Sequence, residues 1–189
     1  MKTIKLFIAL IITILFFETA SAADSKFTFE PLYGVETALV RYPEPPRYVT
    51  RATYGARVLY GVTLLSAEAE FTQARSRKDY PDIDQKVEDT SDRLSIGART
   101  TIPMSQYIGF YVRAGGRASR GETVVTTAGV SETHKNPLRI DPYAGAGLQL
   151  AFSSNFALNA GATMIRNSES KYDVQYTLGI SARFGNITP

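Results

Sequence analysis

The segment Tyr172-Asp-Val-Gln-Tyr-Thr-Leu-Gly-Ile-Ser-Ala-Arg-Phe184 alternates between apolar and polar side chains over its whole length. Because successive side chains of a β-strand point to opposite faces, the pattern predicts a strand with one apolar and one polar face. Strands of soluble domains usually have about five or six residues, whereas a strand that crosses a bilayer at a tilt needs roughly 9–11. The length of this segment therefore favours a transmembrane strand.

The N-terminus has the three parts of a secretory signal peptide. Lys2 and Lys5 precede the apolar run Leu6–Phe17, and Ala20-Ser21-Ala22 offers a cleavage site. The apolar run is too short for a spanning helix. We therefore predict a signal peptide over residues 1–22 and one exported domain over residues 23–189.

Composition excludes several classes of protein. The chain has no Cys, which excludes a disulfide framework and a lipid-attachment cysteine. Of its 21 Lys and Arg and 18 Asp and Glu, a signal peptide would remove Lys2, Lys5 and Glu18, leaving 19 basic and 17 acidic residues. This near balance argues neither for nor against an anionic partner, and we expect no nucleic-acid partner.

Seven further segments alternate in the same way, and the connections between them are short and long in turn. The predicted strands are Phe27–Arg41, Arg51–Leu64, Leu65–Gln73, Arg93–Ile102, Tyr107–Ser119, Arg139–Ala151, Phe156–Ile165 and Tyr172–Phe184. Long polar connections cover Tyr42–Thr50, Ala74–Asp92 and Arg120–Leu138, and a shorter one covers Asn167–Lys171. Transmembrane barrels combine short periplasmic turns with longer outer loops. The sequence predicts an all-β, eight-stranded, antiparallel, up-and-down transmembrane β-barrel.

A soluble lipocalin-type barrel or a β-sandwich would turn the apolar face inward, and alternation alone does not choose between the two directions. Glycines such as Gly97 and Gly145 on the polar face suit a crowded interior. Aromatic residues such as Tyr60 and Tyr172 lie near strand ends on the apolar face, as in the girdles at the membrane interfaces. Both features favour an apolar face toward lipid.

The short turns predict the register of the strands. A two-residue turn at Leu64-Leu65 places Arg57 opposite Thr72 and keeps polar faces together. Phe152 pairs with Phe156 around Ser153–Asn155. A four-residue turn at Pro103–Gln106 would join opposite faces, so we expect five residues or a bulge there.

The segment Thr177-x-Gly179-x-x-Ala182-x-Phe184 resembles the terminal-strand signal of Gram-negative outer-membrane proteins. The eight segments and Pro142–Phe152 are similar to the family of small barrels that includes the OmpA transmembrane domain, OmpX and Ail. The resemblance implies a location in the outer membrane, contact with its lipid, and assembly by the barrel-assembly machinery through Thr177, Gly179, Ala182 and Phe184. Members of this family include structural anchors, adhesins and a few enzymes.

The polar face carries many charges. They are Glu30, Glu36, Glu68, Glu70, Asp141, Asp173, Arg51, Arg57, Arg93, Arg99, Arg113, Arg117, Arg139 and Arg183. A selectivity filter or a catalytic carboxylate pair is one interpretation. Because an eight-stranded barrel is just filled by its side chains and buried charges must be paired, an ion-pair network that closes the lumen is the other. We expect the network, with a structural or adhesin-like role, and a small porin as the alternative.

The outer loops offer weak signals of catalysis. Ser131–Lys135 contains the one histidine, His134, beside Ser131 and Glu132, as a lipid hydrolase would need, but a loop does not orient a nucleophile and base. The acidic residues Asp79, Asp82, Asp84, Glu88, Asp89 and Asp92 lack the spacing of a calcium loop. We therefore expect solvated loops, with no catalytic, cofactor or metal site.

Small residues gather on the outward face of the fifth to seventh predicted strands. They are Ala114, Gly116, Ala118, Ala144, Ala146, Ala160 and Ala162. In lipid, association depends on close packing, which small residues permit. This wall is a candidate contact for a second copy or another barrel, or it is a plain lipid surface.

Overall fold

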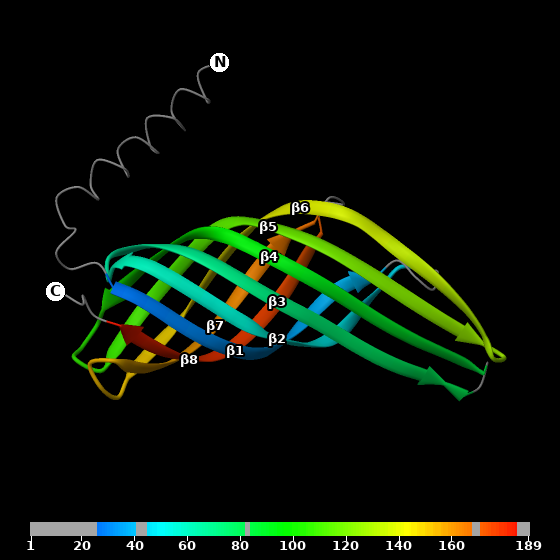
Figure 1. Cartoon of the computed structure of the whole chain (residues 1–189), viewed down its shortest axis with the longest axis horizontal. Coiled ribbons are helices and arrows are strands. Elements are labelled where there is room, and N and C mark those ends of the chain that lie inside the picture. The colour runs from blue at the N-terminus through cyan, green and yellow to red at the C-terminus, as the bar shows by residue number, and fades with distance from the viewer. Residues whose placement is uncertain (1–25, 41–44, 82–83, 168–170, 185–189) are drawn as a thin grey trace, which may run out of the picture.

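The computed structural model describes residues 26–40, 45–81, 84–167 and 171–184, which form a closed barrel of eight strands in chain order (Figure 1). The strands are β1 Lys26–Val40, β2 Arg47–Val62, β3 Leu65–Tyr80, β4 Gln85–Pro103, β5 Ile108–Thr127, β6 Val130–Ala151, β7 Phe156–Arg166 and β8 Tyr172–Phe184. β1 pairs with both β2 and β8, and all neighbours are antiparallel, so the predicted fold is confirmed. The predicted signal peptide lies outside the described residues.

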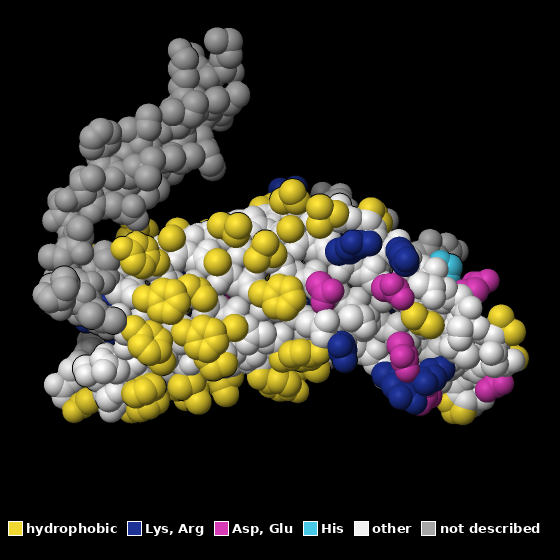
Figure 2. Space-filling view, viewed as in Figure 1, with side chains coloured by type: hydrophobic (Ala, Val, Ile, Leu, Met, Phe, Trp, Pro, Cys, Tyr) yellow, Lys and Arg dark blue, Asp and Glu magenta, His cyan; other side chains and the backbone are white. Residues whose placement is uncertain are grey.

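The two faces of the wall point as the sequence predicted. In β8, Tyr176 and Leu178 are exposed, whereas Asp173 and Gln175 are buried. Figure 2 shows apolar side chains spread over the face of the barrel in view, and charged side chains gathered toward one end. An apolar exterior around a polar interior excludes the soluble barrel and the sandwich. Within the described ranges, no helix has the length and hydropathy to cross a membrane.

The first turn lies one residue earlier than predicted. Val62 pairs with Leu65, so the turn residues are Thr63 and Leu64, and Arg57 lies opposite Glu70 rather than Thr72. The predicted register is therefore wrong by two residues, although polar faces still meet because the shift is even. The observed register places the Arg57 guanidinium directly against the Glu70 carboxylate, which stabilises both buried charges.

The other two short turns have the predicted geometry. Pro103 pairs with Gly109, which leaves five residues in the turn, as the parity of the faces requires. The Phe152 amide donates to the Phe156 carbonyl at 3.2 Å, and their rings stack with centroids 6.4 Å apart.

Most of the two longest predicted loops is strand instead. β3 continues to Tyr80, and β4 already begins at Gln85. β5 and β6 are joined by a tight turn, in which Ala128 and Gly129 have φ of 49° and 82°. The outer parts of these strands form a four-stranded extension beyond the barrel (Figure 1). We call it the projecting sheet; it comprises Ser76–Tyr80, Gln85–Asp92, Arg120–Thr127 and Val130–Leu138, and the inward side chains at its base, such as Asp89, line the outer mouth of the lumen. Both its faces carry polar residues, so the alternation that marks a lipid-facing strand is missing there.

Candidate functional site

Arg57 is the centre of a buried ion-pair group in the half of the lumen near the short turns. Its strand pairs it with Glu30 on one side and Glu70 on the other. Nη1 lies 2.7 Å from Glu30 Oε1, Nη2 lies 2.6 Å from Glu70 Oε2, and Nε lies 3.6 Å from Glu68 Oε2. The Arg57 side chain is 0% exposed, so one guanidinium contacts three carboxylates away from water.

Two further arginines complete this group. Arg113 contacts Glu68 and Glu70, each at 2.7 Å, and Arg99 contacts Glu30 at 3.3 Å. The Arg99 guanidinium also lies 3.7 Å from the ring centroid of Tyr111, a cation–π contact. We call Glu30, Glu68, Glu70, Arg57, Arg99 and Arg113 the inner cluster; its three acids and three bases balance.

A second group surrounds Glu36 nearer the outer mouth. Glu36 contacts Arg51 at 2.9 Å and Arg117 at 2.6 Å, and it also pairs with Arg93. Arg51 reaches Asp89 at 2.5 Å. We call Glu36, Asp89, Arg51, Arg93 and Arg117 the outer cluster; it has three bases and two acids.

Asp89 was predicted in a solvated loop, and this prediction is wrong. Its side chain is buried because β4 extends outward and turns Asp89 into the lumen, where it also accepts a hydrogen bond from Thr123 at 2.9 Å. The sequence could have predicted this burial, because Asp89 lies an even number of residues from inward Arg93 and therefore on the same face of the strand.

The remaining predicted interior charges lie near the two mouths. Arg139 contacts Asp141 at 2.9 Å and Asp173 at 3.9 Å at the outer mouth. Arg183 lies at the opposite mouth and donates to Gln149 Oε1 at 2.6 Å. The described hydrogen bond of its side chain is thus to an amide, and no described ion pair joins it to the carboxylates of the inner cluster.

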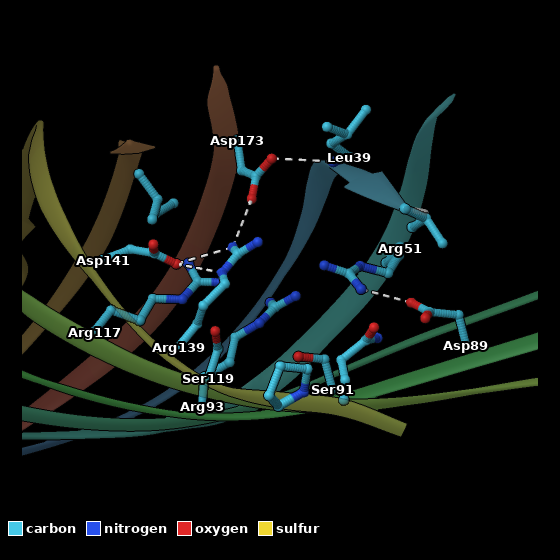
Figure 3. A pocket seen from close by; sticks show the side chains of 15 residues that line it. Leu39, Arg51, Asp89, Ser91, Arg93, Arg117, Ser119, Arg139, Asp141 and Asp173 are labelled. Carbon is cyan, nitrogen blue, oxygen red and sulfur yellow. Dashed lines mark hydrogen bonds and ion pairs between the residues drawn. The ribbon is translucent and has the colours of Figure 1, made fainter. Parts of the chain in front are cut away.

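Each mouth of the barrel contains a small pocket. The outer pocket has a volume of about 90 Å³ and is lined by arginines of the outer cluster and by Arg139, Asp141 and Asp173 (Figure 3). The pocket at the other end has a volume of about 40 Å³ and is lined by Glu30, Arg99 and Arg183. The two clusters lie between these mouths.

The projecting sheet holds Ser131, Glu132 and His134, which suggested hydrolysis, and most of the acidic residues considered for metal binding; Asp84 lies in the adjoining turn and Asp82 outside the described residues. His134 lies 3.5 Å from Glu132, while the Ser131 hydroxyl bonds to Thr126 at 2.8 Å. Lys86 hydrogen-bonds Glu88 at 3.0 Å and lowers the pKa of that carboxyl. Over the ranges that the structure describes, no three His, Cys, Asp or Glu residues are grouped to hold a metal ion.

The wall of small residues is interrupted by larger ones. Ala114 lies opposite Ala144, and Ala146 opposite Ala162. However, Ala118 pairs with Ile140 and Ala160 with Leu148. The lateral contact stays a prediction.

The terminal-strand residues lie along the β1–β8 seam. Thr177, Gly179, Ala182 and Phe184 pair with Gly34, Leu32, Phe29 and Phe27. A Cβ at Gly179 would lie 2.7 Å from Glu30 Oε1, so this glycine makes room for the inner cluster. Its role in assembly stays a prediction.

Comparison with known proteins finds similarity of fold, to solved structures, and no match of sequence. No family model and no curated protein matches the chain. Among solved structures, Ail of Yersinia pestis in complex with sucrose octasulfate is 15% identical with a TM-score of 0.58, over 85% of this chain and 99% of that chain. Neisserial surface protein A is 13% identical with a TM-score of 0.58, over 84% and 97%. The N-terminal barrel of Pseudomonas aeruginosa OprF is 15% identical with a TM-score of 0.56, over 85% and 99%. The chain therefore has the fold of the small outer-membrane barrels, as its resemblance implied.

Proposed function

We propose that this outer-membrane barrel is a non-conducting anchor that holds the projecting sheet outside the membrane for contact with other molecules. The observation that carries the proposal is the filling of the lumen by the inner and outer clusters. Their side chains are almost fully buried and join across the barrel by direct ion pairs. A solute path would need these pairs to separate, which leaves buried charges without partners.

The purified protein should show no steady ohmic conductance in a planar lipid bilayer, because the ion pairs occupy the water path. A stable, large pore in every wild-type preparation would instead make the protein a small porin.

The surface role is supported by the extension of β6 past its neighbour. The β6–β7 ladder ends at the pair Tyr143 and Ile165, yet β6 continues outward to Val130. An edge strand of this kind can pair with an extended segment of another protein. Pro137 cannot donate to such a ladder, so we assign the contact to the outer part of the sheet, Val130–Asn136. One structural neighbour, Ail, is an attachment invasion locus protein.

Trimming the projecting sheet should abolish adhesion without unfolding the barrel. In the trimmed variant, an Asn-Gly turn replaces Arg77–Glu88 and joins Ser76 to Asp89, which are paired in the sheet. A second Asn-Gly turn replaces Val124–Thr133 and joins Thr123 to His134, which are also paired. Adhesion of expressing bacteria to cultured epithelial cells should fall to the level of cells that lack the protein. Equal adhesion by trimmed and full-length protein, at equal surface amounts, would contradict the surface role.

A lipid-modifying activity has less support. Among the described residues, the Ser131 hydroxyl is bonded to Thr126 and His134 lies near Glu132, so this segment does not form a nucleophile–base pair. We keep assembly through the terminal strand and lateral pairing through the small residues as further hypotheses.

A further inference from the structure

Arg93 is a buried cation whose hydrogen-bonding capacity is mostly unused. Its side chain is 1% exposed and its Nη2 pairs with Glu36. Its Nε and Nη1 have no hydrogen-bond partner in the described protein. A guanidinium has five N–H donors, and leaving buried donors of a charged group unsatisfied is destabilising.

The Arg93 side chain lies beside a pocket that opens to the outside. Arg93 lines the outer pocket, and Figure 3 shows its guanidinium between Arg51 and Arg139. Ser91 and Ser119 line the same pocket and bring hydroxyl groups to it. A cavity needs roughly 10–15 Å³ of such volume to hold one water molecule, so a pocket of about 90 Å³ has room for several waters or for a group of few atoms.

The guanidinium groups nearest the donors of Arg93 favour an anion there. Glu36 is shared among three of them, although over the pocket as a whole four arginines are balanced by Glu36, Asp89, Asp141 and Asp173. The pocket also contains Asp89, which is paired with Arg51. The two other carboxylates that line it are engaged as well: Asp141 by Arg139, and Asp173 by Arg139 and the Leu39 amide at 3.0 Å.

We propose that the outer pocket binds a small oxyanion, a carboxylate or phosphate group, on the free donors of Arg93. Guanidinium groups bind these oxyanions by charge-assisted hydrogen bonds, which are stronger than those between neutral groups. The anion satisfies the donors of Arg93, among the three guanidinium groups that share Glu36. It enters from the outer aqueous side, either as a free solute or as the anionic group of a larger ligand.

The experiment is a titration of the purified barrel in lipid-free detergent micelles with inorganic phosphate, and separately with acetate, at constant ionic strength. Nuclear magnetic resonance would follow the Arg93 Nε–Hε signal and the backbone amide of Ser91. A saturable shift with either probe supports the site, and the probe that binds more tightly identifies the oxyanion. Linear shifts with both probes would show that only water and non-specific ions occupy the pocket, and would overturn the proposal.

Two variants and one control make the result specific. Arg93→Gln removes the donors, and Ser119→Leu fills the pocket without changing any charge. Each should raise the dissociation constant by about tenfold or more, whereas Arg77→Gln, at the exposed tip, should leave it within about twofold. Should Arg93→Gln fail to fold, Ser119→Leu decides the question alone. Wild-type affinity in Ser119→Leu would exclude the pocket as the binding site.

Discussion

Replacing Arg57 with Ala should lower the free energy of unfolding by about 3–5 kcal/mol, because removing one partner strands buried charges. Arg57 touches three carboxylates and is 0% exposed. Without it, Glu30 keeps only Arg99 as an ion-pair partner among the described residues, at 3.3 Å. Arg113 then serves both Glu68 and Glu70.

The measurement is urea unfolding of the refolded barrel, followed by circular dichroism because the chain has no Trp. Arg77→Ala is the matched control: Arg77 is 63% exposed and lies 3.7 Å from Glu88, so its loss should cost less than about 1 kcal/mol. Adding Glu70→Met to Arg57→Met should recover stability, since two acids and two bases then remain in the inner cluster. If Arg57→Ala and Arg77→Ala destabilise equally, the inner cluster does not stabilise the barrel.

The membrane-spanning part of the fold was predictable because lipid imposes the alternation. Lipid outside and a polar lumen inside force a period of two on each wall strand, from Tyr172 to Phe184 above all. In the projecting sheet this constraint ends, because water rather than lipid surrounds the strands and both faces can carry polar residues. The sequence pattern therefore stopped near Gln73 and Arg93, although β3 continues to Tyr80 and β4 begins at Gln85.

The sequence predicted which charged residues face the lumen better than it predicted which of them pair with one another. Alternation identifies inward charges strand by strand, but the partners depend on register around the closed ring. Glu36 in β1 contacts arginines from β2, β4 and β5, which no local pattern relates. Placing a two-residue turn at Leu64-Leu65 predicted Thr72 opposite Arg57. Pairing opposite charges between β2 and β3 instead places Glu70 opposite Arg57, as the structure does. Arg183 lies at an open mouth, where it is partly exposed and bonds an amide, so its charge is not forced into a pair.

Placing a charge on the outer wall tests the lipid-facing assignment. Leu178 lies in β8 between outward Tyr176 and Ile180, and it is 52% exposed. Leu178→Arg should make folding into lipid vesicles less favourable by about 2–4 kcal/mol, because Arg at the bilayer midplane loses its hydration. The same change at Leu138, in the projecting sheet and 66% exposed, should cost about 0–1 kcal/mol, because water reaches that position.

The pair of variants separates the effect of lipid from that of surface exposure. Both residues are leucines, both are exposed on a strand, and Leu138 is the more exposed of the two. If exposure alone decided the cost, the two arginines would be tolerated alike. Refolding yields and urea unfolding in vesicles should instead show a large loss for Leu178→Arg only. Equal tolerance would mean that the wall around Leu178 does not face the hydrocarbon, and the membrane placement of the barrel would be wrong.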